Sequence, residues 1–159
     1  MTVGGTREAK DGELRALQAA LAAEHAAVYG YGVVGGRIGE GRRTEARTAY
    51  DAHRARRDAL VRAVADTGAE PVAAAAGYAL PFQVSDAASA VRLAARLEDR
   101  VAGVYGDLVR ASEGERRRGA AEAMREAAVR SVRWSGGSVP FPGLAERSGT
   151  ASGTPAPSA

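Results

Sequence analysis

Apolar residues recur every three or four positions in four long stretches of the chain. This spacing is typical of amphipathic helices and predicts helices over residues 11–37, 44–66, 86–110 and 112–135. Short polar turns follow the first and third helices, whereas the connection through residues 70–84 is long. The pattern therefore predicts an all-α, up-down four-helix bundle in which a long crossover joins helices 2 and 3.

Residues that commonly cap helices stand at the start of each predicted helix. They are Asp11, Thr44, Ser85 or Asp86, and Ser112. Ser112 and Glu115 also have the spacing of a capping box. Gly68 and Gly136 are expected to end the second and fourth helices.

A single helical domain is expected between two irregular ends. Residues 1–10 are polar and predict a flexible N-terminus, and residues 11–144 hold the helical domain. Residues 139–144 are expected to fold back onto the end of the bundle. Residues 145–159 are mostly Ser, Gly, Thr, Ala and Pro, which predicts a disordered tail.

The long crossover carries helix breakers and apolar residues together. Pro71, Gly77 and Pro81 forbid a long helix. A connection of this length with apolar side chains is expected to pack across the bundle, and the anchors are Tyr78, Leu80 and Phe82.

Two carboxylates fall on the apolar stripes of similar helices. Glu24 is followed seven residues later by Tyr31, and Glu98 is followed in the same way by Tyr105. Seven residues make two helical turns, so each Glu shares a helix face with its Tyr. A carboxylate on a core-facing stripe is unfavourable unless it is paired, protonated or bound to a metal. The two glutamates are therefore the starting point for a functional site.

The second helix also turns polar groups inward. Its stripe carries His53 and Arg57 together with Tyr50. His25 lies beside the seam of the first helix and is interpreted as a boundary residue. Trp134 is interpreted as a core or end-capping aromatic residue.

Four short segments resemble an actinobacterial ferritin-like domain family of unknown function. They are Glu24-His25, residues 52–58, Leu97-Glu98 and Arg133-Trp134. The resemblance covers roughly residues 12 to 144 and implies a ferritin-like bundle, but it implies no established activity.

Ferritin-like di-iron proteins take one Glu from each of two helices and a Glu-x-x-His from each of the other two. Glu24 and Glu98 match the single carboxylates, and His53 matches one His. Tyr50 stands where the bridging Glu belongs, and Val129 stands where the second His belongs. The candidate ligands for iron or manganese are therefore Glu24, His53, Glu98 and Glu126. The last is doubtful, because the inward stripe of Met124, Ala128 and Ser131 turns Glu126 outward.

A metal-free polar cluster is the favoured alternative. Arg57 lies one turn beyond His53 and is expected to pair with the buried carboxylates. The hydroxyls of Tyr31, Tyr105 and Tyr50 would supply the remaining hydrogen bonds. An inward Arg would also repel a metal cation, so no cofactor is expected, with iron or manganese as the alternative.

Composition narrows the remaining function classes. The absence of Cys excludes disulfides and thiolate metal sites, and no nucleophile triad or phosphate-binding loop appears. No apolar run is long enough for a membrane span, and the N-terminus lacks a signal peptide, so a cytoplasmic protein is expected. The net charge is only +3, and acidic residues separate the Arg clusters, which disfavours nucleic-acid binding.

Two function classes stay open. The favoured class is a non-enzymatic helical module, in which helix faces rich in Ala and Gly form a homodimer or bind another protein. The alternative is a metal-binding ferritin-like protein or oxidoreductase. A weak nucleic-acid-binding module is the second alternative.

Overall fold

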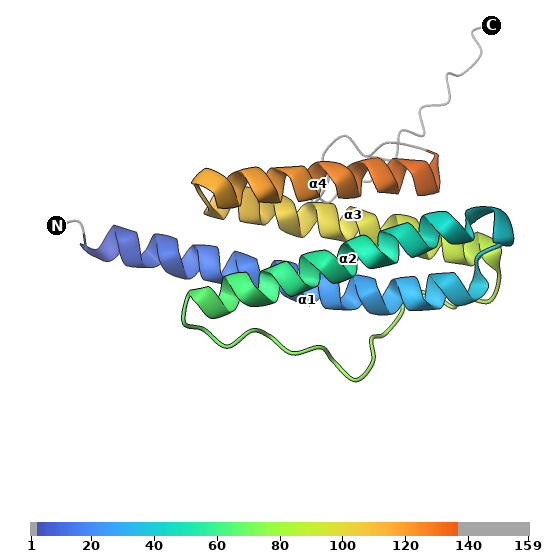
Figure 1. The fold of residues 1–159 in the computed structure, drawn as a ribbon, viewed down its shortest axis with the longest axis horizontal. Coiled ribbons are helices and arrows are strands. Elements are labelled where there is room, and N and C mark those ends of the chain that lie inside the picture. Colours follow the sequence, from blue (N-terminus) through green and yellow to red (C-terminus); the bar gives the residue numbers. More distant parts are fainter. Residues whose placement is uncertain (1–2, 137–159) are drawn as a thin grey trace, which may run out of the picture.

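The computed structural model describes residues 3–136, and these form four helices (Figure 1). The helices are α1 (Val3–Arg37), α2 (Glu40–Asp66), α3 (Ala87–Ala111) and α4 (Gly114–Ser135). None of the described residues is in a β-strand, so the prediction of an all-α fold is confirmed. The predictions for residues 139–144 and 145–159 fall outside the described residues.

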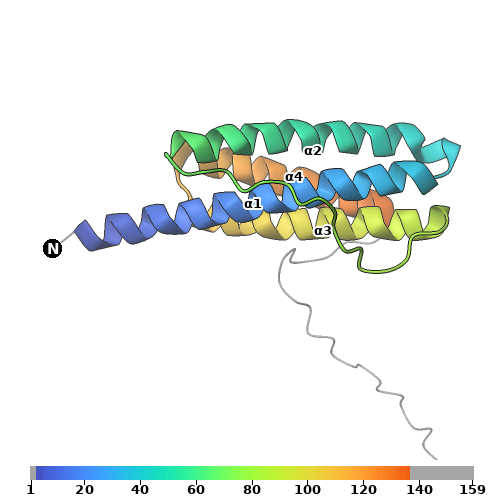
Figure 2. The same cartoon turned by 90° about the horizontal axis from the view of Figure 1, so that it is seen from below.

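The four helices form two antiparallel hairpins. α1 packs against both α2 and α3, and α4 packs against α3. The crossover runs along the length of the bundle beside α1, so that α2 and α3 point in the same direction (Figures 1 and 2). None of the helices in residues 3–136 is long and apolar enough to cross a membrane.

Hydrogen bonds fasten the start of the crossover to α1. The side chain of Gln18 donates from Nε2 to the carbonyl of Glu70 over 2.7 Å and accepts from the Val72 amide over 2.9 Å. The His25 ring donates from Nε2 to the Val72 carbonyl over 3.0 Å. His25 is half-buried at this seam, as the sequence predicted.

The apolar residues of the crossover anchor its second half. Tyr78, Leu80 and Phe82 are all half-buried. The ring of Tyr78 lies 5.4 Å from the ring of Tyr29 on α1, measured between centroids. The crossover therefore packs across the bundle, as its apolar residues predicted.

Two helices begin earlier than predicted. α1 begins at Val3, whereas Asp11 was the expected cap and residues 1–10 were expected to be flexible. Its first turns project beyond the other helices and are exposed, so they lack the apolar burial on which the prediction relied (Figure 2). α2 begins at Glu40, directly after Gly39, so Thr44 lies inside the helix.

The two predicted caps of the second hairpin have different outcomes. Asp86 caps α3, because its Oδ1 accepts from the amide of Ser89 over 2.7 Å. The capping box expected from Ser112 and Glu115 is wrong. The Ser112 hydroxyl instead donates to the carbonyl of Leu108 over 2.6 Å, because in so short a turn this residue ends α3. Gly136 ends α4 with a φ of 74°, as expected.

Buried apolar side chains form two separate cores along the bundle. One is built on Leu17, Leu21, Leu60, Tyr105 and Leu108. The other is built on Val34, Ile38, Leu93 and Trp134. On α2, α3 and α4 the polar residue described below lies between residues of the two cores, and on α1 Glu24 lies near the end of the first core, one turn before Ala27. A polar layer therefore lies between the two hydrophobic cores.

The helix α1 makes close contact with α3 at Gly30. A Cβ atom there would lie 2.5 Å from Cδ1 of Leu97, whereas a Cβ atom at Gly32 would meet no described atom within 4 Å.

We predict that Gly30→Leu lowers the melting temperature, because overpacking costs about 1–3 kcal/mol. Gly32→Ala should raise it, because Ala is about 1 kcal/mol more favourable in a helix. Thermal unfolding followed by circular dichroism checks both changes, and a loss of stability in Gly32→Ala would contradict this account.

Candidate functional site

The centre of the bundle holds a histidine ring between two carboxylates. His53 Nδ1 lies 2.6 Å from Oε2 of Glu24, and Nε2 lies 3.0 Å from Oε1 of Glu98. All three residues are fully buried, with 0% exposure. The structure therefore brings together three side chains that the sequence placed on inward stripes of α1, α2 and α3.

Each carboxylate also accepts a hydrogen bond from a tyrosine on the neighbouring helix. The Tyr105 hydroxyl donates to Oε1 of Glu24 over 2.7 Å, and the Tyr31 hydroxyl donates to Oε1 of Glu98 over 2.6 Å. α1 and α3 thus exchange Glu–Tyr bonds, which accounts for the matching seven-residue spacing in the two helices. Trp134 is buried, as predicted, and its Nε1 donates to the Tyr31 hydroxyl over 2.9 Å.

The arginine of the cluster comes from α4 rather than from α2. Arg130 Nε donates to Oε1 of Glu98 over 2.8 Å. The prediction that Arg57 pairs with the buried carboxylates is wrong, because its guanidinium binds its sequence neighbour Asp58 over 2.7 Å. The side chain of Arg57 is half-buried, and both of its hydrogen bonds among the described residues go to Asp58.

Two further predicted members lie outside the cluster. Tyr50 is half-buried, and the guanidinium of Arg54 lies 5.7 Å from its ring centre. The side chain of Glu126 is 38% exposed and pairs with Arg56, which belongs to α2. Nη1 of Arg130 lies 3.6 Å from the same carboxylate. Glu126 therefore joins two arginines at the edge of the site and is not a fourth acidic group at its centre.

The arrangement makes His53 a cation. Burial alone would lower its pKa, but hydrogen bonds to Glu24 and Glu98 and the charges of these carboxylates outweigh burial and raise the pKa to about 9. Both ring nitrogens face carboxylate oxygens, so both carry protons. The imidazolium and the Arg130 guanidinium balance the charges of the two glutamates.

The pKa values of Glu98, Tyr31 and Tyr105 are shifted in the directions that keep these hydrogen bonds. Burial opposes ionisation of Glu98, but the hydrogen bond and charge of His53, with the charge of Arg130, lower its pKa. Burial and the neighbouring carboxylates raise the pKa of Tyr31 and Tyr105, so both remain hydroxyl donors. Glu98 is thus an ionised acceptor surrounded by donors.

This hydrogen bonding does not suit metal ligation. A histidine binds a metal through an unprotonated nitrogen, and both nitrogens of His53 are engaged as donors. Among the described residues, no group of three or more His, Cys, Asp or Glu side chains is placed to hold a metal ion. Oε2 of Glu98 and Nη2 of Arg130 are buried without a hydrogen-bond partner within residues 3–136.

Sequence reasoning missed Arg130 and Arg56. The buried residues of α4 include Ala127, Ser131 and Trp134, so its core stripe is shifted from the one predicted. Arg130 lies three residues after Ala127 and four before Trp134, and this spacing was the available signal. Arg56 and Arg57 are adjacent in the sequence. The position of Glu126 on α4 determines that Arg56, and not Arg57, forms the ion pair with it.

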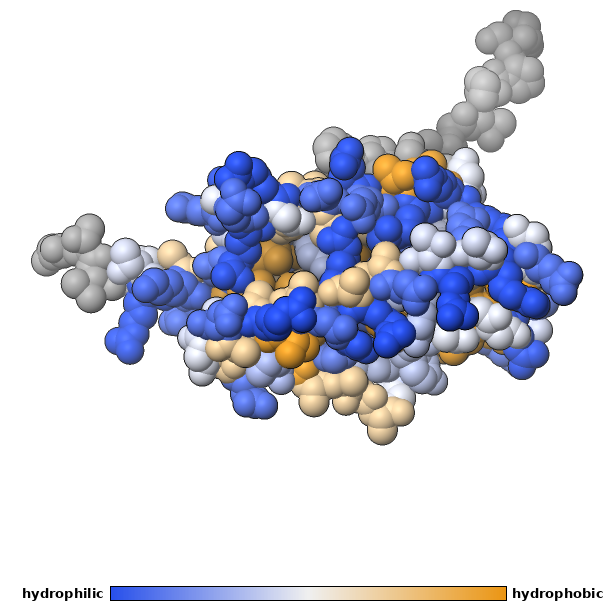
Figure 3. Space-filling view, viewed as in Figure 1, coloured by the Kyte–Doolittle hydropathy of each residue, from blue (hydrophilic) through white to orange (hydrophobic). Residues whose placement is uncertain are grey.

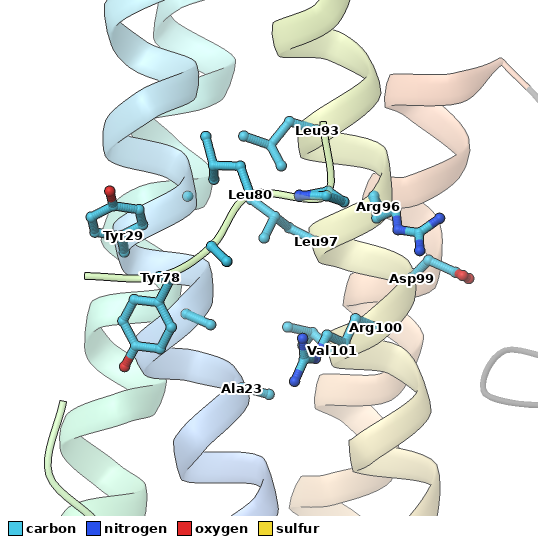
Figure 4. Close-up of a pocket in the computed structure, with 14 residues that line it drawn as sticks. Ala23, Tyr29, Tyr78, Leu80, Leu93, Arg96, Leu97, Asp99, Arg100 and Val101 are labelled. Carbon is cyan, nitrogen blue, oxygen red and sulfur yellow. The ribbon is translucent and has the colours of Figure 1, made fainter. Parts of the chain in front are cut away.

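A cavity lies apart from the cluster, between α1, α3 and the crossover (Figure 4). Its volume is about 640 Å³, and Leu80, Leu93 and Leu97 line it. Figure 4 shows Arg100 reaching from α3 toward α1, while Asp99 points away. No member of the ion cluster lines this cavity.

We predict that the free energy of unfolding falls as the pH rises from about 6.5 to about 9. The pKa of His53 is about 9 in the folded protein and about 6.5 when unfolded, so its contribution is complete below pH 6.5 and lost through pH 9. The loss should be roughly 3 kcal/mol, since one pKa unit corresponds to about 1.4 kcal/mol. Urea unfolding across this pH range measures it.

The second histidine provides the control for this titration. His25→Gln should keep the decline with pH, whereas His53→Gln should lower stability at pH 6.5 and flatten the decline. Ring chemical shifts should also report a protonated His53 at pH 8. A neutral His53 at that pH would contradict the proposed charge state.

Comparison with known proteins places the chain in a family. Its structure is similar to the crystal structure of a conserved hypothetical protein, rv2844, from Mycobacterium tuberculosis, with a TM-score of 0.76 and 40% sequence identity. The match covers 78% of this chain and 95% of that chain. No curated protein matches the chain. Residues 16–146 match the family described as Domain of unknown function (DUF4439), and the chain belongs to this family.

Proposed function

We propose that this protein is a ferritin-like helical module in which a buried ion cluster takes the place of a metal centre. It acts as a non-enzymatic structural or interaction domain. The observation that carries the proposal is the His53 ring, which donates from both nitrogens to the carboxylates of Glu24 and Glu98.

The charges of the cluster support the proposal that protein cations stand where a metal would. In ferritin-like di-iron proteins, inward carboxylates and imidazoles surround metal cations. Here the positive charge between Glu24 and Glu98 is the protonated ring of His53, and Arg130 adds a second positive charge. Two negative and two positive groups leave the cluster neutral without a metal.

The helix order supports the ferritin-like assignment. Two hairpins are joined by a crossover that spans the bundle, which is the arrangement of ferritin-like folds (Figure 1). The single glutamates are on α1 and α3, as in that fold. On α2, Tyr50 stands where a further carboxylate ligand would be, and on α4 the residue that reaches the centre is Arg130.

The burial of the cluster favours a structural role over catalysis. Glu24, His53 and Glu98 are completely buried, so a substrate has no exposed surface of these residues to contact. A catalytic group must come within hydrogen-bond reach of the atom on which it acts. The cluster instead supplies charged hydrogen bonds that connect all four helices.

Metal binding is the second candidate, and Glu98 favours it. Its Oε2 atom is buried and accepts no hydrogen bond from the described residues. Carboxylate and imidazole ligands suit iron or manganese. Binding such an ion would require His53 to lose a proton and Glu24, His53 and Glu98 to move, because their present placement within residues 3–136 forms no metal site.

Metal content distinguishes the two candidates. Protein purified without an affinity tag should contain far less than one iron or manganese per chain by elemental analysis. Adding either metal should leave the melting temperature unchanged, because only a ligand that binds the folded state raises it. Near-stoichiometric iron that disappears in Glu24→Gln and Glu98→Gln would overturn the proposed function.

We predict that Glu98→Gln destabilises the fold by about 3–5 kcal/mol, because it removes the buried negative charge that faces both His53 and Arg130. Glu126→Gln is the matched control and should change stability by less than about 1 kcal/mol, since its ion pair is partly exposed. Chemical denaturation of the metal-free protein measures both. Equal effects of the two substitutions would contradict a structural role for the central cluster.

We further propose that the module works through protein contacts, with a second copy of the chain as the expected partner. The outer face of α4 supports this, because Val129 and Val132 are 44% and 38% exposed. Figure 3 shows an otherwise mostly hydrophilic surface over α2 and α4. Sedimentation of the wild type and of Val129→Glu tests this: a dimer that the substitution dissociates is the expected result.

A further inference from the structure

A second concave site lies on the surface between α1 and α2. It is a pocket of about 490 Å³. α1 lines it with Tyr31, Gly32 and Gly35, and α2 lines it with Ala46 and four larger residues, which are Arg43, Arg47, Tyr50 and Arg54. The four larger residues follow one another at spacings of four, three and four, so they occupy one face of the helix. The pocket is thus a basic helix face opposite a glycine-rich one.

The arginines of this pocket are weakly neutralised. Arg43 lies 3.8 Å from Glu40, and these side chains are 61% and 91% exposed. Arg47 lies 3.8 Å from Asp51, with exposures of 79% and 56%. Such long, exposed pairs hold their groups only loosely. Arg54 contacts the ring of Tyr50 and has no ion pair of 4.0 Å or less within residues 3–136.

No packing contact among the described residues requires a glycine at position 32 or 35. Gly is the least favourable helix residue after Pro, and Gly30 is accounted for by its close contact with Leu97. Gly32 and Gly35 differ, because a Cβ atom at either would meet no described atom within 4 Å. A side chain at either position would instead extend into the pocket. The two glycines therefore keep the pocket open and leave the α1 backbone accessible to a ligand.

We propose that this pocket binds a phosphate-bearing small molecule of about the size of a nucleotide. Arginine presents a planar set of donors that matches phosphate oxygens, and three arginines line one cavity. Its volume lies within the range of small-molecule sites. Tyr50 offers an aromatic face beside the arginines.

The charge of the pocket disfavours the competing occupants. A second copy using the same surface would bring the arginines of two chains together, which repels. A long nucleic acid would contact basic residues along an extended surface, whereas Arg43, Arg47 and Arg54 line one pocket. A compact polyanion satisfies all three arginines at once.

Calorimetric titration of the full chain tests the proposal. The probes are ATP, pyrophosphate and inorganic phosphate, with a 20-nucleotide single-stranded DNA as the polymer. We expect ATP or pyrophosphate to bind the wild type and to perturb the backbone amide signals of Gly32 and Gly35. Stronger binding of ATP points to a nucleotide, and equal binding of pyrophosphate assigns recognition to the phosphoryl groups; both support the proposal.

Two variants block the pocket in different ways. Gly35→Met fills the cavity and removes a helix-weakening residue, so it should reduce affinity at least tenfold without lowering the melting temperature. The triple variant Arg43→Gln, Arg47→Gln and Arg54→Gln should do the same by removing charge. Its matched control is Arg92→Gln, Arg96→Gln and Arg100→Gln on α3, which makes the same change in net charge and should retain binding.

Four outcomes would overturn the proposal. They are the absence of binding by all three phosphate probes, binding that survives Gly35→Met, an equal loss in the two triple variants, and binding of the DNA without binding of ATP or pyrophosphate. The equal loss would indicate non-specific attraction to a basic protein. All titrations use metal-free protein, because Tyr31 lines this pocket and also donates to Glu98 in the central cluster.

Discussion

The position of His53 between two glutamates is the interaction on which the structure depends. A buried carboxylate needs compensating charge and hydrogen bonds, and here both come from neighbouring helices. The imidazolium of His53 joins α2 to Glu24 on α1 and to Glu98 on α3, while Arg130 joins α4 to the same centre. Because each carboxylate also accepts a tyrosine hydroxyl, little freedom is left in the relative height of the helices. The cluster therefore specifies how the bundle is aligned.

The apolar cores alone would determine that alignment less strictly. Their side chains are mainly small, with Ala making up much of the buried surface on either side of the cluster. Small apolar residues permit close packing, but they still pack well when one helix slides by a turn along its neighbour. Directional hydrogen bonds between helices break on such a shift. A polar layer between two Ala-rich cores thus combines close helix approach with a single arrangement of the helices.

The same helix α1 serves different purposes on its different faces. One face carries Glu24 and Tyr31 into the centre, and Gly30 allows close contact with α3. The face toward α2 ends in glycines with open space above them, beside a row of arginines. Close contact with Leu97 accounts for Gly30, whereas a side chain at Gly32 would meet no described atom within 4 Å.

The sequence by itself determined the four helices, the long crossover, and the inward placement of Glu24, His53 and Glu98, because these follow from periodicity along single helices. It misjudged the start of α1, where a helix continues past the apolar contacts that make it predictable. Only the tertiary structure decided which arginine joins the cluster. Arg57 and Arg130 both lie near inward stripes, and the choice depends on the rotation of α4 and on the nearest competing carboxylate. Such choices depend on distances between helices, which the spacing of residues within one helix does not contain.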